Sequence, residues 1–217
     1  MSSSTPSTVG SLDIRRLILV PALITLAVTL LRLAGEVMHW SPRLFNREAG
    51  GPGSLVGIVW LVPVFAIYFA LKVLRAGDRP RLGRAALLAL GAIAVWVAAA
   101  VVLNKMQPGP MTGIGMFSLA SLVAVAIAYA GWPTLGKVLV AYGLSARIPV
   151  AIIMLIALYA SWGTHYEKGP PGFPAMGVLS TWFWIGFLPQ LTLWMAFTVA
   201  LGILIGAAVG AFRRAEG

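Results

Sequence analysis

Long apolar stretches, separated by short polar segments, dominate the chain. They cover residues 17–35, 54–71, 85–103, 113–130, 148–163 and 178–212. Most approach the roughly 20 residues that an α-helix needs to cross the hydrocarbon core of a bilayer. The pattern predicts an all-α fold, a polytopic transmembrane helix bundle of about six spans that forms one domain over residues 14–212. Residues 1–13 are rich in Ser and Thr, which predicts a disordered N-terminus, and residues 213–217 form a short tail.

The last two stretches depart from the ideal length. The fifth would be roughly 24 Å long as a helix, so it either begins earlier or crosses where the bilayer thins. The sixth would be roughly 52 Å long, which exceeds a core of about 30 Å. Pro189 divides the sixth stretch. We expect an aromatic interfacial segment over residues 178–188 and a full span over 190–212, with one tilted, kinked helix as the alternative. Apolar residues over 132–144 indicate either a short interfacial helix or an anchored loop.

The composition agrees with a membrane protein. Only 10% of the residues are charged, against about 25% in soluble domains. The net charge of +10 comes from basic residues that flank the apolar stretches, so it indicates membrane orientation. We therefore expect the lipid bilayer as a partner, and no nucleic acid. Arg15 and Arg16 precede the first stretch as in a signal peptide, but no A-x-A cleavage site follows, which predicts a retained span.

The distribution of Lys and Arg predicts that both termini lie on the cytoplasmic side of the inner membrane. With the N-terminus inside, four basic residues fall in the outer connections: Arg43, Arg47, Lys105 and Lys168. Eleven fall in the cytoplasmic connections: Arg15, Arg16, Lys72, Arg75, Arg79, Arg81, Arg84, Lys137, Arg147, Arg213 and Arg214.

The inventory of reactive side chains is small. The absence of cysteine excludes disulfides, thiolate metal sites and cysteine nucleophiles. No carboxylate lies deep in a predicted span, which argues against ion-coupled transport. We therefore expect a non-enzymatic protein, either a small permease or channel or an accessory subunit of a larger membrane complex. Arg32, Asn104 and Gln190 are candidate cavity-lining residues, and Arg32 can pair with Glu36 one helical turn away.

Gly202, Gly206 and Gly210 form a row on one face of the last span. Glycine at every fourth position lets another helix approach closely, which predicts helix packing along this row. The partner helix is either part of the same chain or part of a second copy, so a homo-oligomer is one expectation.

A shift of 126 residues aligns His39 with His165 and suggests that two helical hairpins are copies of each other. Both histidines would then lie at the outer ends of spans one and five, with Glu36 and Glu167 beside them. This arrangement predicts a metal or haem site, with the carboxylates as supporting partners. The alternative function is therefore a cofactor-bearing membrane enzyme or electron carrier, although nothing else in the sequence requires a cofactor. The competing interpretation is that both histidines are solvated loop residues.

The predicted topology can be tested with reporter fusions. Fusions after Gly77 and Gly217 should report a cytoplasmic location, because most Lys and Arg residues lie on that side. Fusions after Gly51 and Gly169 should report a periplasmic location. A periplasmic reporter at Gly217 would contradict the six-span arrangement.

Overall fold

The computed structural model describes residues 12–50 and 53–215, and it is all-α over this part of the chain. Six helical segments there are long and apolar enough to cross a membrane. The first five are α1 (Ile14–Val37), α2 (Leu61–Arg75), which follows a 3-10 turn (Ile58–Trp60), α3 (Leu82–Met106), α4 (Pro110–Gly131) and α5 (Pro133–Ala160). The predicted all-α bundle of six spans is thus confirmed. Disorder was expected for residues 1–13. Residues 1–11 lie outside the described residues, so this expectation stays a prediction.

The helix starts follow simple local rules. The Asp13 side chain caps α1 by accepting a hydrogen bond from the Arg16 amide (3.2 Å). α4 and α5 both begin with proline, which is tolerated in the first helical turn because its missing N–H would have no partner there. Trp132 alone separates α4 from α5.

The sixth segment is one long, irregular helix. It consists of α6 (Val178–Thr181), a π-helical stretch (Trp182–Phe187), α7 (Leu188–Leu191) and α8 (Leu193–Ala215). Pro189 cannot donate a backbone hydrogen bond, and Thr192 leaves helical geometry with φ −123° and ψ −70°. The structure therefore has the kinked single helix, and residues 178–188 do not form a separate element.

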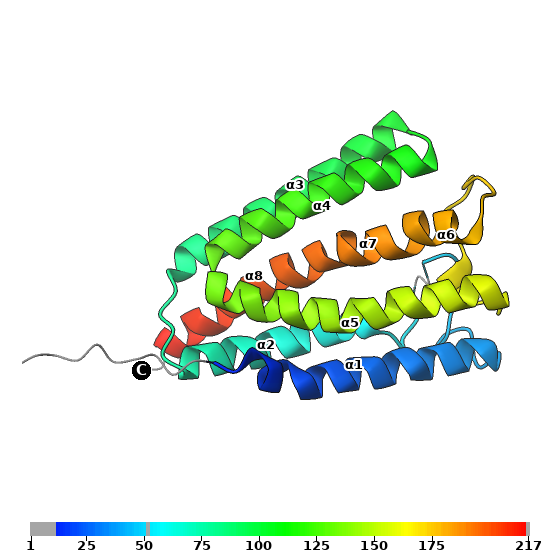
Figure 1. Ribbon diagram of the computed structural model, residues 1–217. Coiled ribbons are helices and arrows are strands. Elements are labelled where there is room, and N and C mark those ends of the chain that lie inside the picture. The colour runs from blue at the N-terminus through cyan, green and yellow to red at the C-terminus, as the bar shows by residue number, and fades with distance from the viewer. Residues whose placement is uncertain (1–11, 51–52, 216–217) are drawn as a thin grey trace, which may run out of the picture.

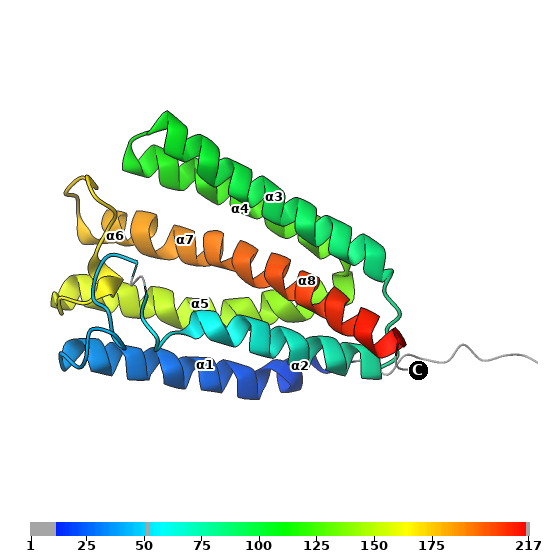
Figure 2. The ribbon, with the colours of Figure 1, turned by 180° about the vertical axis from the view of Figure 1, so that it is seen from behind.

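The segments form two layers with α8 between them. Figures 1 and 2 show the α3–α4 hairpin on one side of α8, and α1, α2 and α5 on the other. α8 packs against α2, α3, α4 and α5, and α1 packs mainly on α5. The described chain begins and ends at the same end of the bundle, as an even number of spans requires. Which side of a membrane this end faces stays a prediction.

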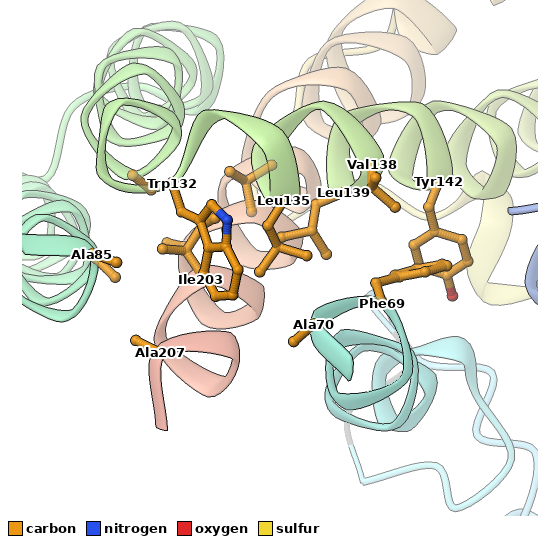
Figure 3. Close-up of a cluster of buried hydrophobic side chains, with 14 of the residues drawn as sticks. Phe69, Ala70, Ala85, Trp132, Leu135, Val138, Leu139, Tyr142, Ile203 and Ala207 are labelled. Carbon is orange, nitrogen blue, oxygen red and sulfur yellow. The ribbon is translucent and has the colours of Figure 1, made fainter. Parts of the chain in front are cut away.

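The start of α5 lies in the main core. Figure 3 shows Trp132, Leu135 and Leu139 facing Ile203 of α8 and Ala70 of α2, and all five side chains are buried. The Trp132 indole Nε1 also donates to Asp78 Oδ2 at 2.7 Å. These contacts are made with protein, so residues 132–144 belong to a packed helix and not to the interfacial helix or loop that the sequence suggested.

α5 is longer than the fifth predicted span because it continues through an arginine. Its 28 residues measure about 42 Å, and Arg147 lies in the middle with only 3% of its surface exposed. The sequence placed Arg147 in a cytoplasmic connection. That placement is wrong, because Arg147 lies within α5. Without Arg147, ten Lys and Arg residues lie on the predicted cytoplasmic side and four on the outer side, so the charge bias that predicts the orientation persists.

The glycine row of α8 packs within the chain. A Cβ atom at Gly202 would lie 2.7 Å from Leu139 Cδ1 of α5, and one at Gly210 would lie 2.6 Å from Leu82 Cδ2 of α3. A Cβ at Gly206 would collide with Leu135. The row is thus covered by α5 and α3, and its close packing does not require a second copy.

Replacing Gly206 with Ile tests this close approach. We expect Gly206→Ile to lower the thermal unfolding midpoint in detergent by about 5 °C or more, because overpacking a tight contact costs about 1–3 kcal/mol. Gly91→Ile is the matched control, since a Cβ at Gly91 in α3 meets no atom within 4 Å. Equal midpoints for the two variants would contradict the packing described for α8.

Candidate functional site

The most deeply buried carboxylate in the described chain is Glu36, in the last turn of α1. Its side chain has no exposed surface. A charge in such a place is tolerated only where hydrogen bonds and opposite charges surround it. Glu36 lies one residue beyond the predicted first span (17–35) but within the apolar helical segment Ile14–Val37, so its burial weakens the prediction that no carboxylate lies deep in a span.

Arg32 and His165 supply the groups that Glu36 needs. Arg32 Nε donates to Glu36 Oε1 at 2.9 Å, so the ion pair that the spacing suggested is present. The backbone N–H of His165 donates to Oε2 at 2.9 Å, and His165 Nδ1 lies 2.6 Å from Oε1. Glu36 thus fastens the end of α1 to the segment that follows α5. We call Arg32, Glu36 and His165 the carboxylate cluster.

The segment between α5 and α6 holds His165 in place. A 3-10 turn (His165–Glu167) follows the end of α5. The Glu167 carboxylate accepts hydrogen bonds from the backbone amides of Trp162 and Gly163, so it shapes this segment and is not a partner of His39 or His165. Tyr166 is buried beside His165, with ring centroids 4.0 Å apart.

The contact with Glu36 fixes the tautomer of His165. An ionised carboxylate can only accept hydrogen bonds, so Nδ1 carries the proton and Nε2 keeps a lone pair. Burial lowers the pKa of the His165 imidazole below its ordinary value of about 6.5, against the opposing effect of Glu36. His165 is therefore neutral at pH 7. Burial raises the pKa of the Tyr166 phenol, which stays protonated as a hydrogen-bond donor.

A cavity of about 440 Å³ lies next to the carboxylate cluster. It reaches between α1, α5 and the sixth helical segment, and the loop before α2 borders it. None of the described residues that line it is acidic. Its polar and aromatic lining residues include Thr29, Arg32, Arg147, His165, Tyr166, Gln190, Trp194 and Trp60.

Arg147 is the most unusual group in this cavity. Its guanidinium lies 4.6 Å from the ring centroid of Trp194, which is a cation–π contact. Within the described part of the chain, no carboxylate lies within 4 Å of it and no side chain or carbonyl accepts a hydrogen bond from it. Arg147 therefore brings an unbalanced positive charge into the bundle.

Gln190 also lacks a full set of partners. It is 7% exposed, its Nε2 makes a weak contact of 3.7 Å with Met154 Sδ, and its Oε1 has no hydrogen-bond partner. The sequence analysis proposed Gln190 and Arg32 as cavity-lining residues, and both line this cavity. Asn104 does not. It is an exposed residue near the tip of the α3–α4 hairpin.

His39 is not part of the carboxylate cluster. It is exposed, adopts φ +58°, and its Nδ1 lies 2.8 Å from the Val37 carbonyl oxygen. His39 lies two residues beyond the end of α1, whereas His165 lies five beyond the end of α5, so the helix ends do not follow the 126-residue shift. Among the described residues, no group of three or more His, Asp or Glu side chains could hold a metal ion. A shared metal or haem site stays a prediction that no contact in this structure supports.

The sequence pattern did not identify Arg147, Tyr166 and Trp194 as residues of the candidate site. The predicted fifth span begins at residue 148, which leaves Arg147 in the preceding connection. The signal that could have corrected this is Pro133, directly after Gly131 and Trp132, which starts a helix long before residue 148.

Removal of the Glu36 charge tests the carboxylate cluster. Glu36→Gln should destabilise the protein by about 3–5 kcal/mol, because it removes the negative charge that pairs with Arg32, whose side chain is only 12% exposed. The measurement is the thermal unfolding midpoint in detergent. Glu48→Gln, which changes an exposed carboxylate in the following loop, should have no effect. A midpoint for Glu36→Gln equal to that of the control would show that the cluster does not stabilise this end of the bundle.

Comparisons with protein-family models, with curated proteins and with solved structures find no match for this chain. The structure itself shows a multi-pass, all-α protein whose six long apolar segments fit a lipid bilayer. Within it, an arginine and a glutamine with incomplete partners face one cavity. The chemistry of that cavity is the basis for the functional inference.

Proposed function

We propose that this membrane protein is a small permease, and that the cavity beside the carboxylate cluster holds its solute during transport. The observation that carries the proposal is a cavity of ligand size inside the bundle, with polar and charged groups in its lining. Its volume of about 440 Å³ lies within the usual range of small-molecule sites, about 300–1,000 Å³.

The depth of the cavity supports a transport role. Thr29 lies eight residues before the end of α1, or about 12 Å along the helix. Arg147 lies thirteen residues before the end of α5, or about 20 Å. A solute that contacts both residues would be well inside the helical segments that are long and apolar enough to cross a membrane.

The irregular sixth segment supports the same proposal. The π-helical stretch and the break at Thr192 flank Gln190, and Trp194 follows the break. Non-helical backbone at membrane depth is tolerated where it lines a cavity, and transporters often bind solutes at interrupted helices. Stretches of π-helix are also frequent at functional sites. This region is where we expect the chain to move during transport.

Cysteine accessibility distinguishes a permease from an accessory subunit or a fixed receptor. The natural chain has no cysteine, so Thr29→Cys introduces a single thiol deep in the cavity. A permease alternates its access, so a charged, membrane-impermeant thiol reagent should modify this thiol when added to either side of sealed vesicles. Ser54→Cys, in the loop that borders the cavity, should react from one side alone.

Leu119→Cys is the negative control, because its side chain is 65% exposed on the apolar surface of α4 and should react from neither side. Modification of Thr29→Cys from one side alone would overturn the permease proposal in favour of a fixed binding site. No modification from either side would contradict an accessible cavity and favour an accessory subunit.

A further inference from the structure

We infer that the cavity binds an oxyanion, meaning a carboxylate or phosphate group, through Arg147 and Gln190. The inference rests on the proposed function for the cavity and adds the chemical class of its ligand. It derives from two buried polar side chains that line the same space. Within the described chain no group accepts a hydrogen bond from Arg147, and Gln190 Oε1 has no hydrogen-bond partner.

The guanidinium of Arg147 is suited to bind a planar anion. Its Cζ lies 4.6 Å from the centroid of the Trp194 ring, and the edge of a guanidinium carries five N–H donors in one plane. This edge matches the paired oxygens of a carboxylate or phosphate, which accept two parallel hydrogen bonds from arginine. A buried arginine also has a strong need for a negative partner.

The charged residues around the cavity do not balance the positive charge of Arg147. Glu36 is the nearby carboxylate, but it is already bound by Arg32 and His165 and it does not line the cavity. With His165 neutral, the charges of Arg32 and Glu36 cancel, and Arg147 contributes a surplus of one positive charge. A bound monoanion would neutralise the site.

Gln190 and Tyr166 add directional contacts. The Gln190 amide can offer either Oε1 or Nε2 to a ligand after half a turn about its last torsion. Tyr166 lines the cavity with a protonated hydroxyl that can donate a hydrogen bond. Trp60, Trp194 and Val150 complete the lining with apolar surface, which suits an organic anion better than a bare inorganic ion.

The first test uses the purified full-length chain in a neutral detergent. Sodium benzoate and inorganic phosphate are the soluble probes, and chloride at equal ionic strength is the reference. We expect at least one oxyanion to raise the thermal unfolding midpoint in a saturable way. Arg147→Gln should weaken the apparent affinity at least tenfold, while Arg213→Gln, an exposed arginine at the opposite end of the bundle, should not change it.

A second variant keeps the inference testable if Arg147→Gln does not fold. Gln190→Glu places a carboxylate inside the cavity, where it can supply the missing negative charge. This variant should be more stable than the natural protein without any added anion, and it should lose the response to oxyanions. Gln190→Leu is its control, because it removes the amide without adding charge and should not raise the midpoint of the ligand-free protein.

A parallel experiment identifies the source of the oxyanion. The protein is placed in phosphatidylcholine nanodiscs with or without phosphatidic acid. A response to the soluble probes indicates a free solute, and a response to phosphatidic acid alone indicates a lipid headgroup; both support an oxyanion site. The inference is overturned if no oxyanion acts beyond chloride, or if the response persists in both Arg147→Gln and Gln190→Glu.

This test and the cysteine test fail independently. If Thr29→Cys reacts from both sides but no oxyanion binds, the permease proposal stands and the ligand class is wrong. If an oxyanion binds through Arg147 but Thr29→Cys reacts from one side alone, the site is real and the transport role is wrong.

Discussion

The structure depends on how a nearly uncharged bundle accommodates the few charges that it buries. In a medium of low dielectric constant, an ion needs opposite charges or several hydrogen bonds close by. Glu36 has them, because Arg32 and His165 surround its carboxylate. That arrangement joins the end of α1 to the segment after α5 and forms the wall of the cavity. Arg147 is also buried, but its main partner is the indole ring of Trp194, and this contrast is the basis on which we propose that the cavity binds a ligand.

The packing of α8 creates the space in which these charges act. Its glycine row draws α5 close at the end where the chain begins and finishes, so the core is dense around Trp132 and Leu135. Towards the other end, the sixth segment is irregular at Thr192 and then π-helical over Trp182–Phe187, with Gln190 between the two. The helices thus pack closely along the glycine row, whereas the cavity lies beside the irregular part of the sixth segment.

The sequence was sufficient for features that depend on local patterns. The apolar stretches predicted the spans, the four-residue glycine spacing predicted a packing face, and the spacing of Arg32 and Glu36 suggested their ion pair. It failed where the outcome depended on tertiary contacts. Arg147 was excluded from a span, because only the folded bundle shows that it faces Trp194 and a cavity. His39 and His165 look equivalent in sequence, but their distances from the helix ends differ, and only His165 reaches Glu36.

We have proposed that the unbalanced charge of Arg147 makes the cavity an oxyanion site within a permease. A crystal structure of the full chain grown with 4-bromobenzoate, a carboxylate whose bromine is located by anomalous diffraction, tests this proposal most sharply. We expect a bromine peak in the cavity, with the carboxylate oxygens about 2.7–2.9 Å from the Arg147 guanidinium nitrogens. Bromine bound elsewhere, for example at the exposed arginines near the C-terminus, with no peak in the cavity, would contradict the proposal.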